Sequence, residues 1–234
     1  MRVASLALLA LSVALSGLTA CDDDPTNPPQ QTATLRVINA VTGTSNVVVL
    51  HNGTILPAPP VSFRATSACA EIPAGSRTLT FRAGADTLTT ASFNFEAGKQ
   101  YTAVIADDLP GTGHIAAVFS DDVTVAAGSN ALRLINATAT AGDVHVRAPG
   151  GPFQIASGNL APFGMYTDPG AGHAFVQRAT NQTDVLLYDV GQTTNLRGSL
   201  SLTNTMPTSR VATIVFFDPG TPAGPTSLLA ARCD

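Results

Sequence analysis

Apolar and polar side chains alternate along much of the chain with a period of two, which predicts β-strands that bury one face. Residues 79–82 read Leu-Thr-Phe-Arg, and residues 91–95 read Ala-Ser-Phe-Asn-Phe. Residues 211–216 read Val-Ala-Thr-Ile-Val-Phe, which is typical of a strand that is packed on both faces. Turn-forming residues separate such runs at 52–53, 73–75, 83–86, 97–99 and 111–113. Short strands with a turn about every eight to twelve residues predict an antiparallel β-sandwich.

A six-residue motif occurs twice in the chain. The segment Leu35-Arg36-Val37-Ile38-Asn39-Ala40 returns 97 residues later as Leu132-Arg133-Leu134-Ile135-Asn136-Ala137, with five of the six positions identical. A second pair of matching segments, 101–108 and 211–218, consists of an apolar strand that runs into an acidic turn followed by proline. Self-similarity over this distance indicates tandem copies of one structural unit.

The repeat predicts two domains of the same fold. The expected fold class is all-β, with two tandem immunoglobulin-like antiparallel β-sandwich domains at residues 32–127 and 128–234. Tyr101 lies just inside a late strand of the first domain and is a candidate tyrosine corner, in which the hydroxyl bonds back to the preceding turn. The second domain has Val211 at the matching position, so this feature is expected in the first domain alone.

Several segments of the first copy resemble a known bacterial family. They are the strand 35–40, His51-Asn52-Gly53, Ile72-Pro73-Ala74-Gly75 and Ala97-Gly98-Lys99-Gln100-Tyr101-Thr102. Together they are similar to domain of unknown function 4397, an immunoglobulin-like repeat of surface and secreted proteins that often occurs in tandem. The resemblance implies the sandwich fold and supplies no catalytic or ligand-binding residue. In the second copy it depends on residues 132–137, because residues 208–211 have no counterpart of Gly-Lys-Gln-Tyr.

The N-terminus has the pattern of an export signal. Arg2 precedes an apolar run over residues 3–20, as in a secretory signal peptide, and an uncleaved anchor helix is the alternative at this length. Leu18-Thr19-Ala20-Cys21 resembles the bacterial lipoprotein pattern, so we expect residues 1–20 to be removed and Cys21 to be lipidated. Residues 21–31 are rich in acids and prolines and are expected to form a disordered spacer. The sequence thus predicts an exported lipoprotein whose lipid anchor holds it to a membrane, on the periplasmic or the cell-surface face.

The remaining cysteines and the charges bear on the compartment and the partners. Once Cys21 is lipidated, Cys69 and Cys233 form an even pair outside the cytoplasm, which predicts a disulfide. Two buried free thiols or an intermolecular bridge are the alternatives. Charged residues make up 12% of the chain and Lys99 is its only lysine. Without a basic patch, nucleic acid is not an expected partner.

No pattern in the sequence identifies a catalytic, cofactor or metal site. The four histidines are His51, His114, His145 and His173. They lack metal-ligand spacing and are expected to be exposed or locally bonded at strand ends. The acidic pairs Asp107-Asp108 and Asp121-Asp122 flank the last strand of the first copy, and adjacent residues of a strand point to opposite faces, which makes poor acid–base dyads. We expect solvated turn acids, with calcium binding by loop oxygens as the alternative.

Three functions fit these observations. A non-catalytic surface module would bind an envelope protein or a glycan through its loops, or hold something away from the membrane. An envelope-associated hydrolase would need polar side chains from several loops to converge in a deep pocket. An accessory subunit of a membrane complex would expose a contiguous apolar patch. The lack of a catalytic motif favours the first function, which requires no cofactor.

Overall fold

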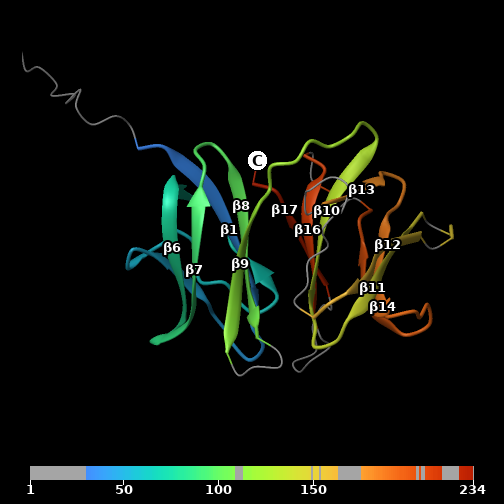
Figure 1. Ribbon diagram of the computed structural model, residues 1–234, viewed down its shortest axis with the longest axis horizontal. Helices are drawn as coiled ribbons and strands as arrows, with labels where there is room; N and C mark the ends of the chain where they lie inside the picture. The colour runs from blue at the N-terminus through green and yellow to red at the C-terminus, as the bar shows by residue number, and fades with distance from the viewer. Residues whose placement is uncertain are drawn as a thin grey trace, which may run out of the picture.

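The fold is built from β-strands. The computed structural model describes residues 30–108, 113–148, 150–152, 154–162, 175–203, 206, 209–217 and 227–233. Every regular element in these ranges is a β-strand, so the prediction of an all-β fold is confirmed (Figure 1). No helix in the described residues is long and apolar enough to cross a membrane. The predicted leader, Cys21, most of the spacer and His173 lie outside the described residues.

The first half of the chain forms two sheets. Sheet I contains β1 (Thr32–Ala40), β4 (Ala65–Thr66), β5 (Ala70–Pro73), β8 (Gln100–Asp107) and β9 (His114–Ser120). Sheet II contains β2 (Val48–His51), β3 (Thr54–Ile55), β6 (Gly75–Ala83) and β7 (Asp86–Phe95). Asn52 and Gly53 both have positive φ, which allows the two-residue turn that joins β2 to β3.

The second half forms two further sheets. Sheet III contains β10 (Ser129–Ala137), β13 (Val176–Ala179), β16 (Val211–Phe217) and β17 (Ser227–Ala231). Sheet IV contains β11 (Gly142–Arg147), β12 (Gln154–Leu160), β14 (Asp184–Asp189) and β15 (Leu196–Ser201). Among the described residues, no strand of sheets I and II pairs with a strand of sheets III and IV.

The two halves have the same strand order. In sheets I and III the first strand of the half lies between the fourth and the next-to-last strand, and the last strand is at the edge: β4-β1-β8-β9 corresponds to β13-β10-β16-β17, and β5 is an additional strand that pairs with β1 in sheet I. In sheets II and IV, β3-β2-β6-β7 corresponds to β12-β11-β14-β15. The first and next-to-last strands of each half, β1 with β8 and β10 with β16, pair in parallel, and all other pairs of named strands are antiparallel. The matching segments of the sequence therefore occupy matching places in the fold.

Each half has its own hydrophobic core. Sheets I and II enclose one cluster, whose largest members include Leu35, Leu79 and Phe81. Sheets III and IV enclose another, which includes Leu132, Leu187 and Phe216. Burial of large apolar side chains between facing sheets is the main stabilising contribution of this architecture.

A third apolar cluster joins the halves, because sheets I and III pack against each other (Figure 1). Sheet I contributes Ile38, Ala40, Val104 and Ala106, and sheet III contributes Ile135, Ala137, Val215, Phe217 and Ala230. The rings of Phe63 and Phe217 meet edge to face at the rim, with centroids 6.0 Å apart. The chain thus forms four successive sheets in the order II, I, III and IV.

The repeated hexapeptide supplies both cores and the joint between them. Leu35 and Val37 point into the first core, whereas Arg36 and Ile38 point to the opposite face of sheet I and toward sheet III. The corresponding residues of β10 divide in the same way. Strand β16 is likewise buried on both faces, as its sequence predicted. A strand in a middle layer needs apolar side chains on both faces, which explains the nearly continuous apolar runs.

The tyrosine corner is confirmed. The hydroxyl oxygen of Tyr101 accepts a hydrogen bond of 2.9 Å from the backbone N–H of Glu96, across the turn from β7 to β8. The Tyr101 ring also packs edge to face against Phe93 and Phe95. The hydrogen bond and the ring contacts of Tyr101 hold β8 in place, and the opposite face of β8 packs against sheet III.

Candidate functional site

The largest group of buried charged side chains lies between sheets I and III. Arg36 on β1 and Arg133 on β10 hold the same position in the repeated motif, and both point into the joint. The two arginine side chains are 4% and 1% exposed. Asp121, which directly follows β9, lies with them and has a side chain that is 2% exposed. Charges are seldom buried this deeply unless they are paired, so the three residues form one unit.

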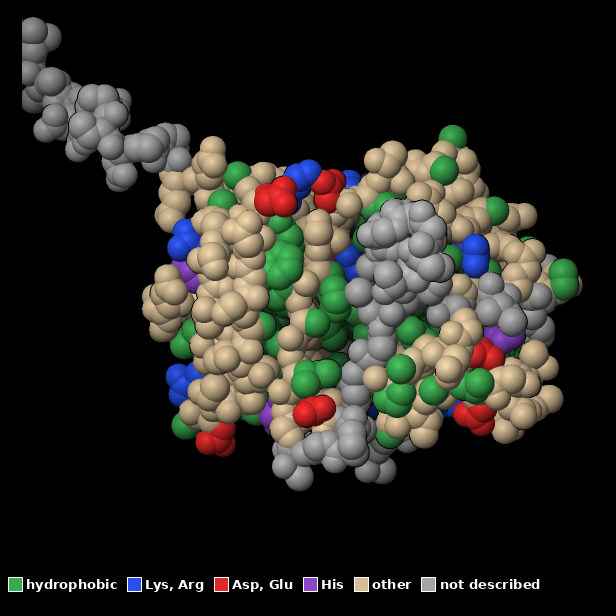
Figure 2. Space-filling view, in the orientation of Figure 1, with side chains coloured by type: hydrophobic (Ala, Val, Ile, Leu, Met, Phe, Trp, Pro, Cys, Tyr) green, Lys and Arg blue, Asp and Glu red, His purple; other side chains and the backbone are tan. Residues whose placement is uncertain are grey.

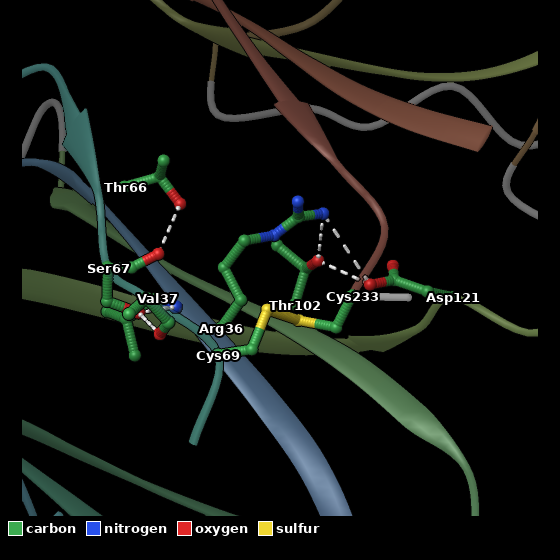
Figure 3. Close-up of a disulfide and its surroundings, with 9 residues drawn as sticks. Arg36, Val37, Thr66, Ser67, Cys69, Thr102, Asp121 and Cys233 are labelled. Carbon is green, nitrogen blue, oxygen red and sulfur yellow. Dashed lines mark hydrogen bonds and ion pairs between the residues drawn. A yellow bond between two sulfur atoms is a disulfide. The ribbon is translucent and has the colours of Figure 1, made fainter. Parts of the chain in front are cut away.

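The carboxylate of Asp121 connects the two halves. Its Oδ1 accepts a hydrogen bond of 2.6 Å from Nη1 of Arg133. Its Oδ2 accepts one of 2.6 Å from the hydroxyl of Thr102 and lies 3.7 Å from Nη2 of Arg36 (Figure 3). Arg36 also donates to the Thr102 hydroxyl at 3.0 Å. Both carboxylate oxygens of Asp121 therefore accept a hydrogen bond, one from each half of the chain.

Arg133 is held from several directions. Besides Asp121, it donates to the hydroxyl of Thr213 at 3.1 Å and to the backbone carbonyl of Ser120. Its guanidinium lies over the rings of Phe175 and Phe119, 4.3 and 5.1 Å from their centroids. Burial lowers the pKa of Arg133, and the charge and hydrogen bond of Asp121 oppose that effect. The guanidinium remains charged at neutral pH, so it needs these partners.

A disulfide crosses the same joint. Cys69 precedes β5 in the first half and Cys233 follows β17 in the second, and their Sγ atoms are bonded with the Cα atoms 6.0 Å apart. Figure 3 shows this bond beside Arg36, Thr102 and Asp121. The joint is therefore held by an apolar cluster, a buried ionic network and a covalent bond.

The model of the family described as Domain of unknown function (DUF4397) matches residues 8–147. The chain belongs to the DUF4397 family. The match includes every strand of sheets I and II and the first two strands of the second half, and so it contains Arg36, Asp121 and Arg133. A comparison with curated proteins found no match.

The DUF4397 match assigns no chemistry to the histidines. His114 lies at the start of β9, with Nδ1 3.2 Å from Oδ1 of Asp107. His51 ends β2; partial burial and the nearby charge of Arg77 lower its pKa, which favours the neutral ring. These two histidines are partly exposed or locally bonded near strand ends, as predicted.

His145 differs from the prediction because it is buried within β11, at 5% exposure. Its ring packs edge to face against Tyr188 of the neighbouring strand, with centroids 5.3 Å apart. The strand is packed on both faces here, and the sequence around His145 contained no sign of what covers the outer one. Among the described residues, no three or more His, Cys, Asp or Glu side chains gather as a metal site would need.

The two acidic pairs have different surroundings. Asp107 accepts hydrogen bonds from the N–H and the hydroxyl of Thr42, and so ties the end of β8 to the loop after β1. Asp122 pairs with Lys99 at the surface, and this contact raises the pKa of Lys99. The expectation that all these acids are solvated was wrong for Asp121, which is buried against the two arginines.

Asp143 is a polar residue whose role the sequence did not reveal. Asp143 follows Gly142 inside β11 and is buried. Its carboxylate accepts backbone hydrogen bonds from Asn159, at 2.5 Å, and from Gly191, at 2.7 Å. This acid therefore ties strand β12 to the turn that follows β14, a structural use of a buried acidic side chain.

A hollow bordered by the loops that follow β1 and β6 is a candidate ligand site. It has a volume of about 660 Å³. Its lining residues are Gly43, Thr44, Ser45, Asn46, Val48, Ile55, Pro60, Ala83 and Gly84. None of these residues has an ionisable side chain, so the lining offers no acid or base to activate the hydroxyl of Thr44 or Ser45.

Proposed function

We propose that the protein is an extracytoplasmic lipoprotein, anchored to a bacterial membrane through Cys21, whose folded part is a non-catalytic binding or structural module. The anchor is supported by the sequence Leu18-Thr19-Ala20-Cys21 at the end of an apolar leader. The acidic, proline-rich spacer that follows suits a tether between a lipid and a folded body.

We further propose that the folded part consists of two tandem immunoglobulin-like sandwiches, both copies of the family domain. The strand order, which the two halves share apart from the additional β5, and the hexapeptide at the same place in β1 and β10 support this proposal. Immunoglobulin-like refers here to the general architecture. Constant-type immunoglobulin domains place strands A, B, E and D in one sheet, whereas the first strand of each half here lies between the fourth and the next-to-last strand.

The observation that carries the non-catalytic proposal is the use made of the buried polar side chains. Arg36, Asp121 and Arg133 bond to one another and to neighbouring hydroxyls across the joint. Asp143 accepts hydrogen bonds from backbone amides of β12 and of the turn after β14. Groups that could do chemistry are thereby engaged in holding sheets and loops at fixed positions. A rigid body that presents loops is what a binding or spacing module requires, and an envelope protein or a glycan is the partner class that we propose.

The anchor is tested by metabolic labelling with a radioactive fatty acid in a bacterial host. The wild-type chain should incorporate label and fractionate with membranes, and Cys21→Ser should lose both properties. Cys69→Ser is the matched control and should keep both. Label in the Cys21→Ser variant would overturn the proposal.

The module proposal is tested with the purified folded part. Crosslinking in envelope extract and a glycan-array screen should identify a bound component, whereas a panel of esterase, peptidase and glycosidase substrates should show no turnover. Turnover that is lost on substitution of a surface acid would instead establish the hydrolase alternative.

A further inference from the structure

Strand β9, at the edge of sheet I, has few features that would prevent another strand from pairing with it. Its sequence is His114-Ile115-Ala116-Ala117-Val118-Phe119-Ser120, which has five consecutive apolar residues between the two polar ends. Among the described residues it pairs only with β8, through seven aligned residue pairs without a register shift. The backbone groups on its other edge therefore have no strand partner in the described part of the chain.

Proteins usually protect such edges with charges, prolines, bulges or very short strands. The other edge strands of the described chain show these devices or polar side chains. Strand β7 carries threonines, a serine and an asparagine, β12 and β15 have register shifts, and β3 has two residues. Strand β17 resembles β9 in composition, but it has no exposed residue. Strand β9 contains no charge, proline, glycine or bulge.

Apolar side chains of β9 also reach the surface. Ile115 is 39% exposed and Ala117 is exposed as well, both on the face of sheet I that carries Val104 and Ala106. Figure 2 shows apolar side chains in a band along this part of the molecule, with acidic and basic side chains gathered at its upper end. Water thus meets an apolar strand with an open edge, which is a surface suited to strand addition.

The sequence of β9 indicates what the added strand is. An antiparallel pairing of two copies of β9, centred on Ala117, places Ile115 opposite Phe119 and Ala116 opposite Val118. It places His114 opposite Ser120, so no like charges face each other. Every cross-strand pair in the apolar stretch is apolar with apolar, which is the pairing that stabilises sheets. A strand that complements itself about its own midpoint fits a twofold axis, and twofold dimers bury the same patch of both subunits.

We propose that the protein forms a twofold homodimer by antiparallel pairing of β9 with β9 of a second copy, which joins the two copies of sheet I into one continuous sheet. This inference does not depend on the lipid anchor or on the non-catalytic role. It predicts that the side chains at position 117 of the two copies are neighbours directly across the axis.

The test is a charge exchange at position 117, followed by sedimentation velocity over a wide concentration range. The protein is expressed with Cys21→Ser, so that no lipid is attached to the sample. The wild-type chain should show a monomer–dimer equilibrium. Ala117→Lys and Ala117→Glu should each move its midpoint to at least about a tenfold higher concentration, because like charges then face each other. An equimolar mixture of the two variants should recover the dimer, since opposite charges then meet.

The control is Ser201→Lys, which adds the same charge to an exposed position on edge strand β15 and should leave the equilibrium unchanged. Circular dichroism checks that each variant is folded, and recovery in the mixture shows independently that both are competent to associate. A wild-type chain that stays monomeric at all concentrations overturns the proposal. Equal weakening by Ser201→Lys, or a mixture no tighter than either variant alone, overturns it as well.

Discussion

Replacing Asp121 with Asn should be among the most destabilising changes that preserve side-chain shape. Asp121 carries the only acidic side chain in the described residues that pairs with Arg36 and Arg133. All three side chains are at most 4% exposed, so water cannot take over from the lost charge. Removing one partner of a buried ionic group leaves an uncompensated charge and typically costs about 3–5 kcal/mol. Here two cations lose their common partner, so we expect a value in the upper part of that range.

The measurement is urea unfolding of the folded part, followed by far-UV circular dichroism because the chain has no tryptophan. In a thermal melt of the same sample, a loss of about 3–5 kcal/mol corresponds to a fall in Tm of roughly 6–20 °C for a chain of about 200 residues. The adjacent Asp122→Asn is the matched control. Its ion pair with Lys99 is exposed, with side chains that are 40% and 53% accessible, and solvent and salt screen such pairs. The control should therefore unfold close to the wild-type midpoint.

A triple variant separates lost charge balance from lost packing. Arg36→Met, Asp121→Leu and Arg133→Met together replace the network with apolar side chains, and such replacements are often neutral or stabilising. The triple variant should recover most of the stability that Asp121→Asn loses. Equal midpoints for Asp121→Asn and Asp122→Asn would refute the reasoning, because the buried carboxylate would then contribute no more than an exposed one.

Four further changes test separate features of the fold. Tyr101→Phe keeps the ring contacts and removes the hydrogen bond from Glu96, so calorimetry should show a loss of about 1 kcal/mol. Cys69→Ser should cost up to roughly 5 kcal/mol in urea unfolding, since the disulfide closes a loop with a sequence separation of 164. Intact mass analysis of the unsubstituted chain should show a gain of two hydrogens on reduction. Gly142→Ala would place its Cβ 2.6 Å from a leucine side chain and 2.8 Å from a backbone carbonyl, so thermal melts should show a loss of about 1–3 kcal/mol. His51 has a lowered pKa in the folded chain, so the unfolded chain binds its proton first and stability falls as the pH drops below about 6.5. His51→Gln should lack this part of the acid dependence in unfolding curves between neutral and mildly acidic pH.

The local fold could be read from the sequence because alternation states which side chains share a face. Leu79 and Phe81 alternate with polar residues, and the structure places both in the first core. Alternation does not state what covers the opposite face. In a two-layer sandwich the face of β1 that carries Arg36 would be open to solvent, whereas here sheet III buries Arg36. The covering sheet comes from a segment 97 residues away, and no local pattern encodes that contact.

The same limit explains the errors at the acids and histidines. Asp121 follows the last strand of the first half and has the composition of a turn, but its environment is set by two arginines from separate strands. His145 lies between Val144 and Val146, as expected for alternation in a strand, and its burial depends on Tyr188 of a later strand. One signal did exist. An arginine between apolar residues in both copies of a repeat requires a buried acceptor, and the acids nearest to the second copy were the place to look.

The joint also shows why two similar units can pack face to face in one defined way. If sheets I and III met through their repeated faces alone, Arg36 and Arg133 would bring two like charges into an apolar layer, which is strongly unfavourable. Asp121 lies in the segment between β9 and β10, outside both copies of the hexapeptide, and it supplies the missing anion between them. The compensation is therefore built into the connection and not into either repeated face. A displacement of one sheet along the other would separate at least one guanidinium from the carboxylate, so the ionic network specifies the register of the joint while the apolar cluster supplies most of its stability.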